Sequence, residues 1–196
     1  MVYFKLILFA LLWIATVYSV ACLAARKLKR VNLKIALLYA STLALLGVFG
    51  EVTIDSAYKF AFGHLFWVYT ILPVHHGYTS RYAIFLWGIY GFAMYLLHDH
   101  TGKAHKIKIT KWLPYQFMAT AIIFEAAVNL SFRAMFGRLI FYYFPNDLWH
   151  LTSIQVLPFY LLGGYVMSAS LNHAKSYPTF YSVGGVLLGS VFVFLA

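Results

Sequence analysis

Long apolar segments restrict this chain more than any other feature of its sequence. Leu6 to Ala25 contains no charged residue, and neither does the segment from Ser176 to Ala196. A helix needs about 20 apolar residues to cross the hydrocarbon core of a bilayer. Composition agrees with spans of this kind, because 63% of the residues are hydrophobic and only 10% are charged. The sequence therefore predicts an integral membrane protein.

We predict an all-α fold, a polytopic bundle of about six transmembrane helices that forms a single domain over residues 1–196. The length leaves room for five or six spans and for no separate soluble domain. The expected spans are about 2–25, 35–62, 82–98, 112–136, 151–171 and 178–196. An aromatic, turn-rich segment at 64–81 is expected to form an ordered interfacial loop between the second and third spans.

Basic residues gather in the predicted connections after the first, third and fifth spans. They are Arg26, Lys27, Lys29, Arg30, Lys34, Lys103, Lys106, Lys108, Lys111 and Lys175. Positively charged connections remain in the cytoplasm, so we expect both termini to lie outside it. The net charge of +10 then reflects topology and attraction to lipid headgroups, and no nucleic-acid partner is expected.

Two acidic side chains, Glu51 and Glu125, lie inside predicted spans, where a charged side chain costs about 3 kcal/mol. Each begins a set of polar residues that recur once per helical turn. The two sets are Glu51, Asp55 and Lys59 in the second span, and Glu125, Asn129 and Arg133 in the fourth. Ionisable groups inside a membrane are usually functional, so the sequence predicts a polar site here.

If the second and fourth spans are neighbours, the two carboxylates form the floor of an outward-facing site and are its candidate catalytic residues. Arg133 and Lys59 are then candidate anion anchors near the mouth. The complete set of expected ligand-binding residues is Asp55, Lys59, His64, His75, His76, Asn129, Arg133, Trp149 and His150. A structural alternative is that Glu51 pairs with Arg133 or Lys59, and Glu125 with Asn129 or a tyrosine, which would only lock the helices together.

The eight histidines raise the question of a metal site. His98 and His100 are two positions apart, so they cannot share one face of a helix, and the histidine boxes of membrane desaturases are absent. We expect neither a metal nor a cofactor. Cys22 is the only cysteine, which excludes an internal disulfide. The sequence contains no Walker-type glycine loop and no Gly-x-Ser-x-Gly elbow, so ATP hydrolysis and serine-hydrolase chemistry lack support.

Several short motifs resemble the transmembrane protein 229 family. They are Gly50-Glu51, Thr79-Ser80, Trp87, Tyr90-Gly91, Phe124-Glu125, Trp149 and Pro158. The similarity covers about residues 47–172, and Phe124 stands where the family often has tryptophan. That family is grouped with bacterial membrane proteins labelled type IV ABC-transporter components. The resemblance implies a transport component of a bacterial inner (plasma) membrane, with Glu51 and Glu125 on the two acidic helix positions of the family.

Three functions remain open at this point. The first is a transport or membrane-accessory component whose polar cavity binds a membrane lipid or a small amphiphile. The second is an integral-membrane enzyme that acts on a lipid or isoprenoid substrate, either with paired carboxylates of which one is a protonated general acid or, as a lesser alternative, with a histidine-bound metal. The third is a structural subunit of a homo-oligomer or of a larger membrane complex, indicated by the small residues of the last span.

Overall fold

The computed structural model describes residues 2–100 and 111–195, and this part of the chain is mostly helical. Its α-helices are α1 (Val2–Ala25), α2 (Leu33–Phe62), α3 (Ala83–His100), α4 (Leu113–Phe136), α5 (Leu157–Ala174) and α6 (Pro178–Phe194). Four stretches are long and apolar enough to cross a membrane, and they are Tyr3–Ala25, Leu33–Phe62, Leu113–Phe136 and Ile154–Ala174. The chain is therefore a helical, multi-pass membrane protein.

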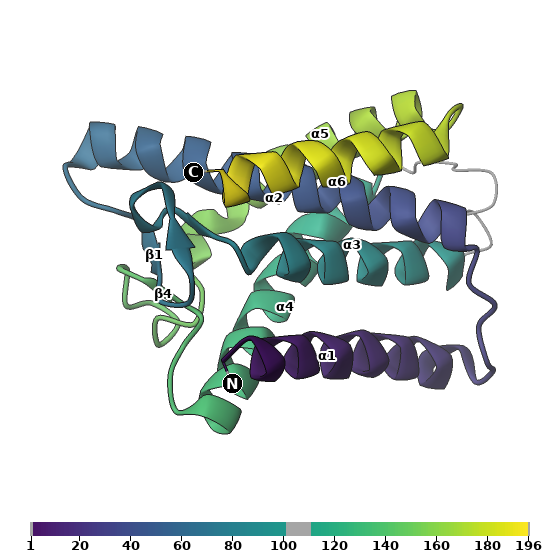
Figure 1. The fold of residues 1–196 in the computed structure, drawn as a ribbon, viewed down its shortest axis with the longest axis horizontal. Coiled ribbons are helices and arrows are strands. Elements are labelled where there is room, and N and C mark those ends of the chain that lie inside the picture. The colour runs from purple at the N-terminus through teal and green to yellow at the C-terminus, as the bar shows by residue number, and fades with distance from the viewer. Residues whose placement is uncertain (1, 101–110, 196) are drawn as a thin grey trace.

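The helices alternate in direction, so their connections lie at two ends of the bundle (Figure 1). Short strands and both described chain ends lie at one end, which we call the strand end. The basic connection between α1 and α2 lies at the opposite end, together with Lys175 after α5, and we call this the basic end. Three of the basic residues expected there, Lys103, Lys106 and Lys108, are outside the described residues.

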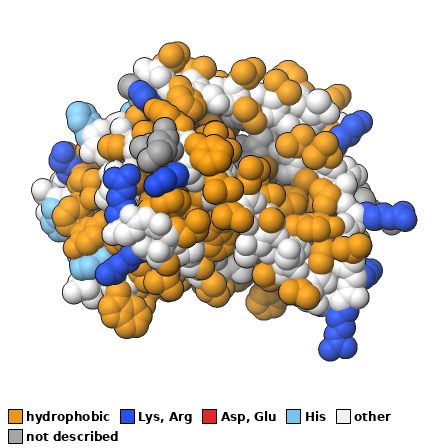
Figure 2. All heavy atoms as spheres, turned by 60° about the horizontal axis from the view of Figure 1, so that its bottom comes forward, with side chains coloured by type: hydrophobic (Ala, Val, Ile, Leu, Met, Phe, Trp, Pro, Cys, Tyr) orange, Lys and Arg blue, Asp and Glu red, His pale blue; other side chains and the backbone are white. Residues whose placement is uncertain are grey.

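The surface between the two ends is apolar, as a lipid-facing surface must be. Figure 2 turns the side that carries α1 forward, and hydrophobic side chains cover the middle of this face while Lys and Arg lie toward its ends. Large exposed hydrophobic residues occur on several helices. Examples are Leu23 in α1, Phe60 in α2, Ile123 in α4 and Phe180 in α6.

The segment between α2 and α3 is ordered and contains strands, which the sequence pattern did not predict. β1 (Trp67–Tyr69) pairs with β4 (Phe141–Tyr143), which follows α4. β2 (Pro73–Val74) pairs with β3 (Thr79–Ser80) within the same connection. Pairing satisfies the backbone polar groups of these aromatic segments where little water is available.

The two halves of the bundle repeat one another. Glu51 and Tyr69 in the first half correspond to Glu125 and Tyr143 in the second, at an offset of 74 positions, and from Thr79 and Thr152 onward the offset is 73. In both halves the glutamate lies on the longer helix and the tyrosine lies on the strand that follows it. The first half runs from α2 through β1 and the β2–β3 pair to α3, and the second half runs from α4 through β4 to α5.

The strand register and the helix ends confirm this correspondence. Val68 of β1 lies directly opposite Tyr142 of β4, its own equivalent, so a pseudo-two-fold axis passes between the two strands. α2 and α4 both end in a left-handed glycine, Gly63 with φ 77° and Gly137 with φ 74°. Glycine adopts this conformation without steric cost and terminates the helix at the same place in each repeat.

Each repeat brings its two helices together at one glycine. A Cβ atom at Gly91 of α3 would lie 2.7 Å from the Cα of Ala40 in α2, and one at Gly164 of α5 would lie 2.5 Å from the Cα of Pro114 in α4. Ala40 and Pro114 are themselves equivalent positions of the two repeats. Small residues therefore permit close helix packing at matching places in both halves.

Gly91→Ala and Gly164→Ala should each destabilise the protein by about 1–3 kcal/mol, because the added methyl groups push two backbones apart. Gly184→Ala in α6 is the matched control, since a Cβ atom there meets nothing within 4 Å. Thermal unfolding in detergent measures the effect. Melting temperatures that are the same for all three variants would contradict the close packing.

The fifth helix begins later than the expected start near residue 151. α5 begins at Leu157, and the residues before it form turns and a short 3₁₀ helix, Ile154–Val156. The Ser153 hydroxyl oxygen accepts a hydrogen bond from the N–H of Gln155, which caps this turn. The corresponding residue of the first repeat, Ser80, caps the start of α3 in the same way through the N–H of Tyr82.

Candidate functional site

Glu51 accepts hydrogen bonds from three different elements of its own repeat. The Tyr69 hydroxyl of β1 and the Trp87 indole N–H of α3, the latter at 2.8 Å, donate to Oε1. The Thr79 hydroxyl of β3 donates to Oε2 at 2.5 Å. The Glu51 side chain is only 7% exposed, so these donors replace the water that a carboxylate otherwise requires.

Glu125 has the equivalent set of partners in the second repeat. The Tyr143 hydroxyl of β4 lies 3.1 Å from both carboxylate oxygens, and the Thr152 hydroxyl donates to Oε2 at 2.7 Å. Tyr160 of α5, at the position that corresponds to the indole donor of the first repeat, also interacts with this carboxylate. A tyrosine, a threonine and a third aromatic residue therefore surround each glutamate in the same order along the chain.

The two strand tyrosines are held as hydrogen-bond donors. Burial and the neighbouring Glu51 carboxylate raise the pKa of the Tyr69 phenol well above its ordinary value. Burial and Glu125 raise the pKa of Tyr143 in the same way. Both phenols therefore keep their protons at physiological pH and fix the positions of the carboxylates.

One helical turn further along, Asp55 and Asn129 attach each helix to the chain that follows it. Asp55 Oδ1 accepts from the N–H of Phe66 at 2.6 Å, and Asn129 Oδ1 accepts from the N–H of Ile140 at 2.9 Å. Both side chains are 0% exposed and neither lines a cavity with the glutamates. The structure therefore assigns these two predicted ligand-binding residues to the scaffold of the site.

The two carboxylates line the same pair of small cavities between the repeats. The larger cavity, about 70 Å³, lies between α2 and α5, and the smaller, about 20 Å³, lies between α3 and α4. Glu51, Glu125, Tyr69, Trp87 and Phe141 line both. The larger cavity has further aromatic walls, which are Trp67, Phe117, Tyr143, Phe159 and Tyr160. The site is thus a pair of acids enclosed by aromatic rings.

The helices that carry the glutamates are not packed along each other, although the sequence led us to consider them as neighbours. α2 packs against α3, α6 and α5, while α4 packs mainly against α5. The two carboxylates reach one cavity because β1 and β4 pair, and each of these strands carries the tyrosine that holds the glutamate of its own repeat.

Neither carboxylate has a basic partner among the side chains that the structure describes. The groups that act on Glu51 and Glu125 are hydroxyl and indole donors and, for Glu51, the charge of the other glutamate. Lys59 is exposed, with its ammonium 5.8 Å from the centre of the Tyr78 ring, and Arg133 is exposed as well. The salt-bridge alternative for Glu51 is therefore wrong, whereas the tyrosine partner considered for Glu125 is present.

The histidines and Trp149, which the sequence predicts as ligand-binding residues, do not reach the carboxylates. His75 interacts with the Phe192 carbonyl at 2.9 Å, His150 with the Tyr143 carbonyl at 2.7 Å, and His64 with the carbonyl of the next residue. His76 and Trp149 are exposed. Within the described residues no three His, Cys, Asp or Glu side chains could hold a metal ion together, and the side chains of His100 and His105 lie outside them.

The sequence does not identify most of the residues that donate hydrogen bonds to the carboxylates. Tyr143, Thr152 and Tyr160 were not recognised as site residues, and neither was Tyr69 in the first repeat. A signal was present, because 18 residues separate glutamate and tyrosine in both halves. Aligning the two polar ladders of the sequence would have matched the two tyrosines.

Comparisons of the chain with family models, with curated proteins and with solved structures find no match. The family resemblance of the short motifs therefore stays a prediction. What the site does must be inferred from its own geometry.

Proposed function

We propose that this protein binds a small cationic amphiphile, such as a lipid with an ammonium headgroup, between its two repeats, and acts as a transport or membrane-accessory component. One observation carries the proposal. Glu51 and Glu125 line one aromatic cavity, and no described basic side chain acts on either of them.

The chemistry of the cavity favours an organic cation. Two carboxylates that face the same small space repel each other when both are ionised. A positive charge between them attracts both and outweighs that repulsion. The faces of tryptophan and tyrosine rings attract a cation further, by about 2 kcal/mol where water is excluded. A hard metal ion would need six or more oxygen ligands, whereas these carboxylate oxygens already accept hydrogen bonds from tyrosine and threonine.

The internal repeat supports a role in transport. Many membrane transporters consist of two repeats and bind their substrate at the interface between them. Here the cavities on the two sides of the carboxylates lie between different helix pairs, α2 with α5 and α3 with α4. A movement of one repeat against the other would widen one cavity and narrow the other.

The orientation in the membrane is also part of the proposal. We infer six spans, with the basic end in the cytoplasm and the strand end, with both termini, outside a bacterial inner membrane. The net charge and the basic connection between α1 and α2 support this orientation. The carboxylates are hydrogen-bonded to residues of the strand end, so the site would face outward.

Choline and its neutral isostere 3,3-dimethylbutan-1-ol provide a direct test of the cation site. We expect choline to bind the protein in nanodiscs about 30-fold more tightly than the alcohol, because only choline gains the attraction of the rings and the carboxylates. Isothermal titration calorimetry measures both ligands, and labelled choline measures flux into proteoliposomes.

The outcomes separate the three functions. Binding accompanied by flux, with choline recovered unchanged, supports transport. Recovery of a chemically altered amphiphile after incubation would favour the enzyme in which a carboxyl acts as a general acid. Equal binding of the charged and neutral ligands, or no binding of either, would contradict the cation site and favour a structural subunit.

A further inference from the structure

A third cavity, separate from the two that the carboxylates line, lies between α1 and the middle of α4. It measures about 380 Å³, which is within the usual range for ligand pockets, and α1, α3 and α4 surround it. Its lining is apolar apart from Thr16, Thr120 and Lys29. The cavity is therefore shaped for a hydrocarbon chain and has one cationic side chain on its wall.

The way α1 is attached explains why this space exists. Near the strand end, Phe9 of α1 packs edge-on against Phe132 of α4, and the Trp13 indole N–H donates to the Ser131 hydroxyl at 3.1 Å. Near the basic end, the Tyr18 hydroxyl donates to the Lys29 carbonyl at 2.9 Å. Around the cavity the three helices contribute small side chains. These are Ala21 and Ala24 of α1, Ala93 of α3 and Ala127 of α4.

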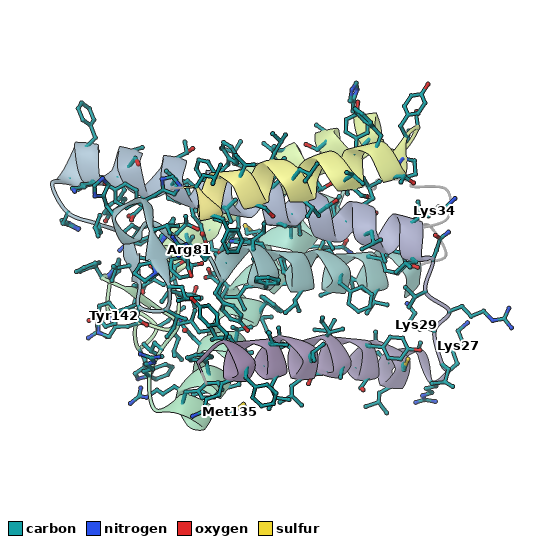
Figure 3. The ribbon with its side chains drawn as sticks, in the orientation of Figure 1. Lys27, Lys29, Lys34, Arg81, Met135 and Tyr142 are labelled. Carbon is teal, nitrogen blue, oxygen red and sulfur yellow. The ribbon has the colours of Figure 1, made fainter. Side chains whose placement is uncertain are left out.

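The positive charge at the basic end indicates which class of lipid fits the cavity. The connection after α1 carries four basic residues and no acidic one, and Lys34 follows at the start of α2. Figure 3 shows Lys27 and Lys29 along this connection and Lys34 at the start of α2. Lys29 is 7% exposed, its ammonium donates to the Leu96 carbonyl at 2.7 Å, and it is the basic residue that lines the cavity.

We propose that this cavity binds one acyl chain of an anionic phospholipid, with the lipid phosphate at Lys29 and the basic connection. Clusters of Lys and Arg next to a transmembrane helix attract anionic headgroups by about 1 kcal/mol per residue. The part of α1 from Thr16 to Ala24 is about 12 Å long, so it extends along much of one acyl chain. Tyr90 and Phe124 close the deep end and also line the smaller carboxylate cavity. The bound acyl chain would therefore pack behind Tyr90 and Phe124, which form one wall of the smaller cavity that Glu51 and Glu125 line.

The test measures which lipid the full chain retains. The protein is reconstituted in vesicles of phosphatidylcholine with 10% phosphatidylglycerol and is then extracted in a neutral detergent. Native mass spectrometry identifies the lipid that remains bound. We expect one phosphatidylglycerol to be retained per chain. Lys29→Gln should lower its occupancy about fivefold, as expected for one basic residue. Lys175→Gln, which removes an exposed basic residue at the same end but outside this connection, is the control for net charge alone and should leave the occupancy unchanged. Ala21→Phe fills the cavity without changing the charge and should also expel the lipid.

Two results would overturn the proposal. One is retained lipid with the same composition as the vesicle, which is adventitious bilayer lipid only. The other is phosphatidylglycerol that remains bound in Ala21→Phe at the wild-type level, which would place it outside the cavity. If Lys29→Gln fails to fold, Ala21→Phe still decides the question. Choline binding is measured in the same samples, so failure here is distinguishable from failure of the carboxylate site.

Discussion

Asn129→Asp is expected to destabilise the folded protein by about 3 kcal/mol or more. The Asn129 side-chain amide donates to the backbone carbonyls of Phe141 and Leu151 at 2.9 and 3.0 Å, and the residue is 0% exposed. An aspartate would lose both hydrogen bonds and direct an oxygen toward two carbonyl oxygens. Chemical or thermal unfolding in detergent measures the loss, because the local attachment of β4 to α4 depends on this residue.

Asp55→Asn, the equivalent substitution in the first repeat, should not lower the stability of the folded protein. Asp55 occupies the position of Asn129, and its Oδ2 has no hydrogen-bond partner among the residues that the structure describes. In Asp55→Asn the new amide would supply donors where Asn129 uses them, so the variant should be at least as stable as the wild type. If Asp55→Asn lowered the free energy of unfolding as much as Asn129→Asp does, the equivalence of the two repeats would be contradicted.

The second large effect concerns the carboxylates. Glu51→Gln and Glu125→Gln should each weaken choline binding by about 30-fold or more, because removing one partner of a buried charge pair costs about 2 kcal/mol or more. Glutamine keeps the size of the side chain and an acceptor for the strand tyrosines, so the two variants are expected to remain folded. Titration calorimetry on the nanodisc samples compares them with the wild type.

Lys59→Gln and Arg133→Gln are the matched controls for this prediction. Both residues belong to the same polar ladders as the glutamates, but their side chains are exposed. We expect their choline affinities to equal that of the wild type. If these variants lost choline binding while the glutamate variants retained it, the two carboxylates would not be the cation site.

The helices could be predicted from the sequence because their cause is local. Apolar segments of sufficient length form helices in a membrane whatever their neighbours are. α1 has both ends where the sequence predicts them, and α2 ends at Phe62 as predicted but begins two residues earlier, at Leu33. Glu51 and Glu125 were also identifiable, since a carboxylate in such a segment is exceptional. These inferences needed no knowledge of which helices pack together.

The partners of the carboxylates depend on tertiary pairing, and for this reason the sequence did not reveal them. Helical periodicity continues a ladder from Glu51 to Lys59, but the end of α2 extends past the end of α6 (Figure 1), so the last turn leaves the site. Tyr69 instead approaches Glu51 through a strand whose register is fixed by β4, far along the chain. Periodicity within one helix carries no information about such contacts.

The stoichiometry of choline binding tests most directly whether the two repeats form one shared site. We predict one choline per chain in the wild type and no comparably tight binding in either Glu51→Gln or Glu125→Gln, because each ligand needs both carboxylates. Two cholines per chain in the wild type, with one retained in each single variant, would contradict a shared site and show that each repeat binds its own cation.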